Sequence, residues 1–195
     1  MPDFSWAESD DWEKAWQPVI DAIGQDFSDG DIKVAADTIE KGQIRRYTEP
    51  LEFDCPLHLD EAVAKQHGYD NIIAPYSGLA TWTSAAIWNP GDGDIYADPS
   101  RNASPNRKMG GQGRPYPSPP TNAGFATDVE YEYFAPFRLG DHLTMRGRKL
   151  LSCLPKETSV GRGAFMVTES EVVNQNGELI VKARLGNYAY VARKK

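Results

Sequence analysis

The chain has 195 residues, with 21 lysines and arginines against 28 aspartates and glutamates, so its formal net charge is −7. Hydrophobic residues make up 40% of the sequence, which is enough for a core and excludes a wholly disordered chain. The acidic balance and the shortness of the basic runs exclude a nucleic-acid-binding role, because such a role needs a basic surface to neutralise phosphates.

The start of the chain is acidic and rich in tryptophan, unlike a secretory signal peptide. No stretch approaches the roughly 18 uninterrupted apolar residues of a membrane span. The sequence therefore predicts a cytoplasmic protein without a membrane-spanning helix. Cys55 and Cys153 cannot form a disulfide framework and lack metal-ligand spacing, so we expect no metal site.

Residues 10–24 are predicted to form a helix, because tryptophans and aliphatic residues recur there at three- and four-residue spacings. Asp10 or Asp11 is the candidate N-cap, and Pro18 allows a kink or a late start. The apolar face is expected to dock this N-terminal segment onto the body of the protein or onto a partner chain.

Three further segments in the first half of the chain carry helix signals. Residues 40–51 predict a short helix or an extended stretch, and residues 60–67 predict a helix with Asp60 as N-cap. Residues 77–88 are the most apolar helical candidate, with Ser77 as N-cap and small residues that would let a sheet approach closely.

Residues 89–124 hold six glycines and seven prolines, and so many breakers predict a long irregular loop. Loops of this length in a compact domain are usually functional or disordered. The basic residues Arg101, Arg107, Lys108 and Arg114 make this insertion a candidate to cover a ligand, and the alternative is a mobile surface insertion.

After the insertion, apolar residues recur at every second position instead of at helical spacing, which is typical of strands. The predicted strands cover residues 128–134, 141–153, 163–174 and 178–191. Asn176 and Gly177 predict a hairpin between the last two strands, since both tolerate positive φ. A meander of strands after one long helix predicts an α+β domain in which an antiparallel sheet buries that helix.

Five segments in this order resemble the MaoC-like acyl dehydratases and (R)-specific enoyl-CoA hydratases, most closely the N-terminal dehydratase type. The segments are IRRY (44–47), CPLHLDEA (55–62), GYDNIIAP (68–75), VEYEYF (129–134) and PFRLGD (136–141). The resemblance implies a hotdog fold, in which a curved antiparallel sheet wraps a central helix. It divides the chain into an N-terminal helical extension, residues 1–34, and a hotdog domain, residues 35–195, which contains the insertion.

The resemblance also implies a lyase of lipid metabolism that needs no cofactor. The expected reaction is hydration of an α,β-unsaturated acyl-CoA or acyl-carrier thioester, or the reverse dehydration of a 3-hydroxyacyl thioester. Such chemistry needs a general base, a general acid and hydrogen-bond donors on the thioester oxygen. The expected assembly is a homodimer, or a heterodimer with another MaoC-like chain, whose sheets join edge to edge.

Hydratases of this family carry their catalytic Asp and His on a loop that reads Gly-Asp-x-Asn-Pro-(aliphatic)-His. Here residues 52–58 read EFDCPLH, so the last three positions match and His58 is the expected base. Phe53 stands at the position of the family Asp, and Cys55 at that of the Asn. Asp54 is the candidate replacement for the missing carboxylate, and the alternative is a solvent-exposed Asp54.

The resemblance places the oxyanion donor at the N-terminus of the central helix, which corresponds to Ser77 and Gly78. Unpaired amides and the helix dipole favour negative charge there. Plain capping by Ser77, beside a small residue needed for packing, is the compatible alternative.

Three functions therefore remain open from the sequence. The first is a hydratase or dehydratase with His58 as base. The second is a non-catalytic subunit that shapes the acyl tunnel of a heteromer, which the Phe53 departure favours. The third is a thioester-binding or thioesterase hotdog, since a fold alone does not dictate the reaction. A nucleophilic role for Cys55 is disfavoured, and His67 and His142 are expected to be structural.

Overall fold

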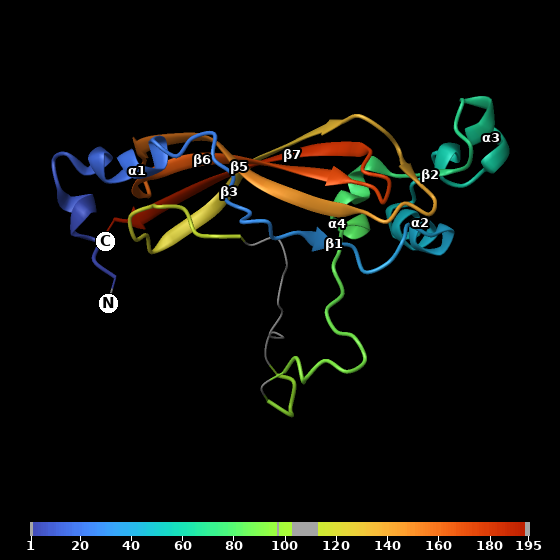
Figure 1. Cartoon of the computed structure of the whole chain (residues 1–195), viewed down its shortest axis with the longest axis horizontal. Helices are drawn as coiled ribbons and strands as arrows, with labels where there is room; N and C mark the ends of the chain where they lie inside the picture. The colour runs from blue at the N-terminus through green and yellow to red at the C-terminus, as the bar shows by residue number, and fades with distance from the viewer. Residues whose placement is uncertain (1, 97, 103–112, 194–195) are drawn as a thin grey trace.

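A five-stranded antiparallel sheet dominates the computed structural model, which describes residues 2–96, 98–102 and 113–193 (Figure 1). The strand order is β1-β5-β6-β7-β3, and a two-stranded sheet pairs β2 with β4. The strands are β1 (Lys33–Val34), β2 (Ile73–Ala74), β3 (Ala123–Tyr133), β4 (Phe137–Arg138), β5 (Thr144–Glu157), β6 (Gly161–Val173) and β7 (Leu179–Ala192). The predicted α+β class with an antiparallel sheet is confirmed.

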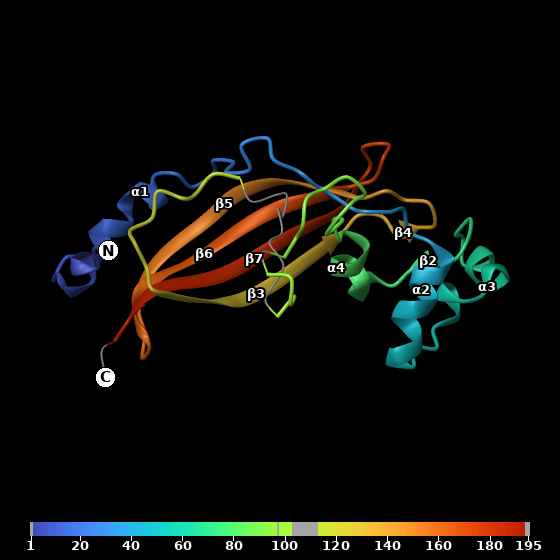
Figure 2. The same cartoon turned by 90° about the horizontal axis from the view of Figure 1, so that it is seen from below.

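The helices are short and gather at the two ends of the long sheet (Figure 2). The α-helices are α1 (Gln17–Ile20), α2 (Lys41–Thr48), α3 (Glu61–Gln66) and α4 (Leu79–Trp82). The 3₁₀ turns are η1 (Ser5–Glu8), η2 (Trp12–Trp16), η3 (Glu49–Leu51), η4 (Pro56–His58) and η5 (Tyr76–Gly78). The helix predicted after Asp60 is confirmed as α3, and the Asp60 carboxylate accepts hydrogen bonds from the amides of Ala62 and Val63.

Each long strand extends beyond its predicted limit at one end and stops one to three residues short of it at the other. β5 continues through Pro155. β1 pairs with β5 at residues 144–145, which leaves the far end of β5 at the sheet edge. A proline there removes no ladder hydrogen bond. The predicted hairpin between β6 and β7 is confirmed. Gly177 has a φ of 78° there, and its amide donates to the Asn174 carbonyl over 2.9 Å.

The first hydrophobic cluster lies where the sheet meets α4. Leu79 and Trp82 of α4 are buried with Val172 of β6 and Val181 of β7. The Trp82 indole also donates to the Pro75 carbonyl over 2.9 Å, so its polar atom is satisfied within the core. α4 therefore packs one face against the sheet, and Ala80 and Thr81 on its other face are exposed.

The second hydrophobic cluster lies at the other end of the sheet, under the N-terminal segment. Trp16 is fully buried there with Ala164 and Met166 of β6. Ala164, Met166 and Val172 are separated by even numbers of residues along β6, so their side chains point to the same face of the sheet. The two clusters therefore occupy one face. The prediction that the N-terminal apolar stripe docks on the body of the protein is confirmed.

The helix predicted over residues 77–88 is wrong in length, because only η5 and the four residues of α4 are helical. Side chains bind the last carbonyls of the turn: the Thr83 hydroxyl donates to the Leu79 carbonyl over 2.8 Å, and the Ser84 hydroxyl to the Ala80 carbonyl over 2.7 Å. The Ser84 carbonyl then accepts from the Ala36 amide over 2.8 Å, which draws the chain away from the helix axis.

The helix predicted over residues 10–24 is also wrong in form, since a 3₁₀ turn precedes the single turn of α1. The Asp11 carboxylate pairs with Lys14 instead of capping a helix. Pro18 lies in the first turn of α1, where its missing N–H leaves no hydrogen bond unmade, so it opens a helix rather than kinking one.

The C-terminal part of the insertion packs against the N-terminal segment. The Arg114 guanidinium lies 4.4 Å from the centre of the Phe27 ring, and that of Arg148 lies 4.2 Å from the centre of the Tyr116 ring. The centres of the Phe27 and Tyr116 rings are themselves 4.7 Å apart, so two contacting rings lie between the two guanidinium groups.

The outer part of the insertion projects away from the sheet (Figure 1). Arg101 lies there with its guanidinium 5.7 Å from the centre of the Tyr96 ring. Arg107 and Lys108 lie outside the described residues, so the ligand-covering role stays a prediction. β3 begins at Ala123, which ends the irregular stretch two residues earlier than predicted.

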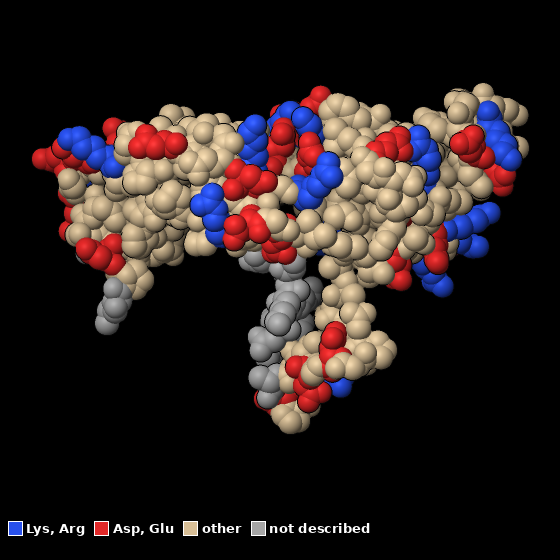
Figure 3. All heavy atoms as spheres, in the orientation of Figure 1, with Lys and Arg blue, Asp and Glu red and all other residues tan. Residues whose placement is uncertain are grey.

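Charges of both signs are interspersed over the face shown in Figure 3. Within residues 2–96, 98–102 and 113–193, no helix has both the length and the apolar character needed to cross a bilayer.

Trp16→Ala is expected to destabilise the protein by about 3–5 kcal/mol, because it empties a large site in the second cluster. Urea denaturation followed by far-UV circular dichroism measures the change. Trp88→Ala is the matched control, since Trp88 is 49% exposed, and its effect should stay within about 0.5 kcal/mol. Equal effects of the two substitutions would contradict the buried docking of the N-terminal segment.

Candidate active site

The loop before His58 is shaped by short-range backbone hydrogen bonds. The Phe53 amide donates to the Thr48 carbonyl over 3.1 Å, which folds the loop back on the end of α2. Pro56 opens η4 with its fixed φ, and the His58 amide donates to the Cys55 carbonyl over 3.1 Å. This turn directs the His58 side chain inward.

The His58 imidazole is held in one orientation by the backbone of β2. Its side chain is buried, with 7% of the residue exposed, and Nδ1 lies 2.7 Å from the Ile73 carbonyl oxygen. Because a carbonyl only accepts, Nδ1 carries the proton of the neutral ring. Nε2 is therefore left with the lone pair that a general base needs.

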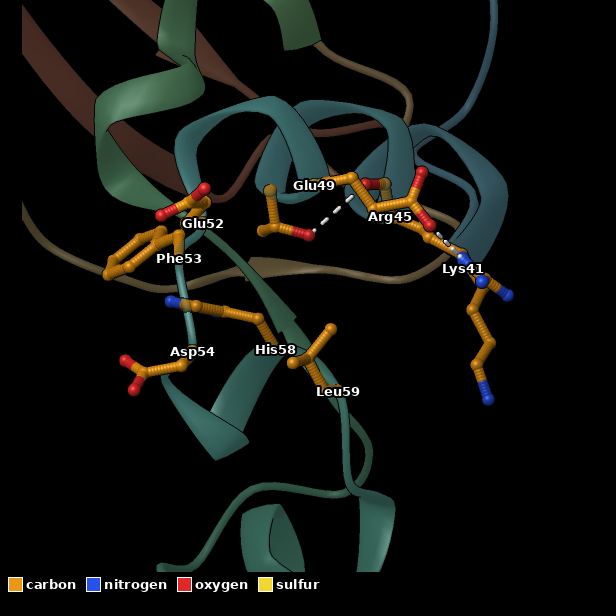
Figure 4. Close-up of a pocket in the computed structure, with 9 residues that line it drawn as sticks. Lys41, Arg45, Glu49, Glu52, Phe53, Asp54, His58 and Leu59 are labelled. Atoms are coloured by element: carbon orange, nitrogen blue, oxygen red, sulfur yellow. Dashed lines mark hydrogen bonds and ion pairs between the residues drawn. The ribbon is translucent and has the colours of Figure 1, made fainter.

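His58 lines a pocket of about 520 Å³ between α2 and the loop (Figure 4). Asp54 lines the same pocket, so the structure brings together two of the four site residues predicted from the sequence. Asp54 is exposed, and within the described part of the chain its carboxylate makes no hydrogen bond to His58.

Phe53 packs directly against the catalytic candidate. The centres of the Phe53 and His58 rings are 5.2 Å apart, and the ring planes are tilted by 50° (Figure 4). The side chain at the position of the family Asp therefore touches the imidazole, but it offers an apolar surface where the family offers a carboxylate. Glu52 and Asp54 are the carboxylates on either side of Phe53 in the sequence, and both line the pocket.

Ser77 and Gly78 do not line the pocket that contains His58. The Ser77 hydroxyl accepts a hydrogen bond from the Tyr47 hydroxyl over 3.0 Å. Gly78 is buried, and its amide donates to the Pro75 carbonyl over 3.1 Å within η5. The Gly78 amide is thus engaged within its own turn, and the predicted oxyanion role stays a prediction.

The requirement for glycine at position 78 has a steric cause. A Cβ atom built there would lie 2.5 Å from the indole of Trp82, which is closer than any real contact. Because Trp82 is fixed in the first cluster, a side chain at this position must displace the turn that carries Ser77.

Charged side chains surround the mouth of the pocket. Lys41 and Arg45 stand against Glu49, Glu52 and Asp54, so the lining has a formal charge of 2 − 3 = −1. Arg45 Nε donates to Glu49 Oε1 over 2.6 Å, and this hydrogen bond lowers the pKa of the Glu49 carboxyl. The pair is exposed and adds little to stability.

Sequence reasoning missed the groups that orient the site. The Ile73 carbonyl has no side-chain signal, and the Tyr47–Ser77 hydrogen bond joins residues 30 positions apart in sequence. The resemblance did include the segment that contains Arg45 and Tyr47, although it gave these residues no role.

Three further side chains of reactive types, Cys153, His67 and His142, have structural environments. Burial raises the pKa of the Cys153 thiol to about 11, so this thiol stays protonated near neutral pH. The rings of His67 and His142 each bond a backbone carbonyl, those of Val63 and Ala35, over 2.9 and 2.8 Å. In the described ranges no group of three metal-ligating side chains comes together.

Solved structures show which class of fold this is. The chain superposes on a chain of the ChsH1-ChsH2 complex from Mycobacterium tuberculosis with a TM-score of 0.58 and 18% identity, over 94% of this chain and 93% of that one. It superposes on the MaoC-like dehydratase from Rhodospirillum rubrum with a TM-score of 0.52 and 21% identity, over 85% and 94% of the two chains. The protein has the hotdog fold predicted from its sequence.

The family follows from the sequence match. Residues 22–103 and 118–183 match the family model described as FAS1-like, dehydratase domain region, so the chain belongs to this family of MaoC-like hotdog dehydratases. A probable enoyl-CoA hydratase alpha subunit from Thermomonospora curvata is 26% identical over 158 residues. The match covers 80% of this chain and 46% of that protein, so the chain spans about half the length of this curated relative.

Gly78→Ala is expected to destabilise the protein by about 1–3 kcal/mol, because the added methyl group collides with the Trp82 indole. Gly42→Ala in α2 is the matched control, since its Cβ meets open space and alanine favours a helix by about 0.5–1 kcal/mol. Urea midpoints of the two variants check both signs, and destabilisation by Gly42→Ala alone would contradict this packing.

Proposed function

We propose that this chain takes part in the hydration of an α,β-unsaturated acyl thioester, or the reverse dehydration of a 3-hydroxyacyl thioester, with His58 as general base. The observation that carries the proposal is the orientation of His58. Its Nδ1 is bonded to the Ile73 carbonyl, which leaves Nε2 free beside an open pocket. A neutral imidazole held in this way is suited to take a proton from water.

Asp54 is proposed as the companion of His58. It lines the same pocket, and an exposed carboxylate one residue from Phe53 can reach a water molecule through a change of rotamer. Ser77 and Gly78 are proposed to hold the thioester oxygen. For this the Gly78 amide exchanges the Pro75 carbonyl for the thioester, since that amide is occupied in the ligand-free chain.

The proposed substrate is an acyl-CoA or acyl-carrier thioester, in keeping with the name of the relative from Thermomonospora curvata. The proposed catalytic unit is the hotdog domain of residues 35–195, with residues 1–34 packed on it as an extension. We propose a dimeric assembly, either of two copies or with another MaoC-like chain. The structure of the ChsH1-ChsH2 complex supports the second form, because its fold is shared and it contains two different chains.

A second candidate function is that of a non-catalytic subunit that shapes the acyl tunnel of a heteromer. The contact between Phe53 and His58 favours this candidate, because an apolar ring occupies the place where the family dyad needs a proton-carrying group. In that case the partner chain supplies the Asp and His, and His58 serves to position the loop.

His58→Ala is expected to lower hydratase activity by about 10²–10⁴-fold, which is the usual contribution of a general base. The loss of ultraviolet absorbance of a conjugated enoyl-CoA measures the rate, for the chain alone and for its mixture with a catalytic MaoC-like chain. His67→Ala is the matched control, because His67 is exposed at the end of α3 and, within the described residues, its ring bonds only the Val63 carbonyl.

The outcomes separate the candidates. A rate lost with His58→Ala and kept with His67→Ala supports the catalytic proposal. Activity that appears only in the mixture and survives His58→Ala supports the tunnel-shaping subunit. Release of free thiol without loss of the double bond would instead indicate a thioesterase.

A further inference from the structure

The turn η5 is held in place by side chains from three other parts of the fold. The Trp82 indole donates to the Pro75 carbonyl over 2.9 Å, and the Tyr133 hydroxyl donates to the Tyr76 carbonyl over 2.9 Å. The third hydrogen bond comes from α2 and reaches a side chain of the turn instead of its backbone. The first two bonds therefore fix the course of the backbone, whereas the third acts on a single hydroxyl group.

Packing against the first hydrophobic cluster fixes the ring of Tyr47. Tyr47 lies in the last turn of α2, three residues after the fully buried Ile44. Its ring centre is 5.2 Å from that of Trp82, and the ring planes are tilted by 56°. Aromatic pairs of this kind prefer particular geometries. The Tyr47 hydroxyl is therefore directed at Ser77 by contacts that do not involve its own oxygen atom.

The direction of the hydrogen bond leaves the Ser77 hydroxyl with a proton to donate. Tyr47 donates over 3.0 Å and Ser77 accepts, as expected for a phenol, which is a stronger acid than an alkyl hydroxyl group. In the part of the chain that the structure describes, Ser77 donates its own proton to no other group. Accepting a bond from Tyr47 also polarises the Ser77 O–H, which makes it a stronger donor.

Ser77 is open to a ligand, in contrast to Gly78. Ser77 is exposed, and its partner Tyr47 lines a hollow of about 530 Å³ between α2 and α4. The Gly78 amide is buried and already donates to the Pro75 carbonyl. The Ser77 hydroxyl is thus the donor of this turn that a thioester oxygen can meet without a rearrangement of the backbone.

We infer that Tyr47 is a positioning residue, which orients and polarises the Ser77 hydroxyl as a donor to the thioester oxygen. Negative charge develops on this oxygen in the enolate that forms when water adds to the β-carbon, and a donor aligned in advance stabilises that charge most. The inference rests on the proposed function and assigns to it a residue that acts through Ser77.

Two hydroxyl deletions on the same turn separate positioning from a structural role. Tyr47→Phe and Tyr133→Phe each remove one bond to η5 and keep the ring, and both tyrosines are partly buried. Tyr47→Phe should lower kcat about five- to tenfold and change KM less than about twofold, because the lost interaction acts on the transition state. Tyr133→Phe should change neither constant by more than about twofold, since Ser77 keeps its partner. The loss of ultraviolet absorbance of a conjugated enoyl-CoA measures both constants, and equal effects of the two substitutions would overturn the inference.

A double substitution shows whether Tyr47 acts through Ser77. Ser77→Ala alone should lower kcat about 10²-fold, the usual effect of removing one oxyanion donor. Adding Tyr47→Phe to Ser77→Ala should then cost less than about twofold, because the hydroxyl that Tyr47 orients is absent. A further loss as large as that of Tyr47→Phe in the wild-type chain would overturn the inference.

Binding of a dienoyl thioester tests the donor without turnover. The probe is 2,4-hexadienoyl-CoA, whose absorption moves to longer wavelength when its carbonyl oxygen accepts a hydrogen bond. It is added to the His58→Ala chain, in which the proposed base cannot consume it. The red shift should be lost on adding Ser77→Ala, reduced at least about twofold on adding Tyr47→Phe, and unchanged on adding Tyr133→Phe. Absence of a red shift in the His58→Ala chain itself would overturn the inference.

Failure of the inference and failure of the proposed function remain distinguishable. A red shift that depends on Ser77 and Tyr47, without turnover by the wild-type chain, would support the inference and overturn the catalytic role of His58. Turnover that depends on His58, with equal red shifts in the chains that carry Tyr47→Phe and Tyr133→Phe, would support the proposed function and overturn the inference. Circular dichroism and urea midpoints check that the variants are folded.

Discussion

The hydrogen bond between His58 Nδ1 and the Ile73 carbonyl is the interaction on which the site depends. It joins the loop after α2 to β2, and β2 is in turn fixed by its pairing with β4. β2 leads directly into η5, so the backbone that orients the imidazole also places Ser77 and Gly78. The proposed base and the proposed thioester-binding turn are therefore both held by the short strand β2, although Ser77 and Gly78 do not line the pocket that contains His58.

Local signals in the sequence predicted local structure well. Asp60 before α3 and Gly177 between β6 and β7 act through neighbours a few residues away, so their patterns were sufficient. The resemblance placed His58 on its loop for the same reason, because the turn opened by Pro56 sets the direction of the ring.

The predictions that were wrong concerned segments whose structure depends on contacts between residues, which a sequence pattern does not show. The helix after Ser77 ended early because the Ser84 hydroxyl takes the Ala80 carbonyl and the Ser84 carbonyl accepts from the amide of Ala36, far away in sequence. The N-terminal helix became shorter turns because burial of Trp16 against β6, about 150 positions away along the chain, decides its shape. The contact of Phe53 with His58 also needed the folded loop, although its effect on the family dyad was visible as a substitution.

The docking of the N-terminal segment has a consequence for synthesis. Residues 12–27 leave the ribosome before β5 and β6, and this docking surface is made more than a hundred residues later. The large apolar side chains of Trp12, Trp16 and Phe27 therefore remain exposed to solvent until most of the chain has emerged. Non-local closure of this kind is slow and favours aggregation. Glu13, Asp21 and Asp26 lie between these aromatic residues in the sequence, and charges next to apolar segments oppose aggregation.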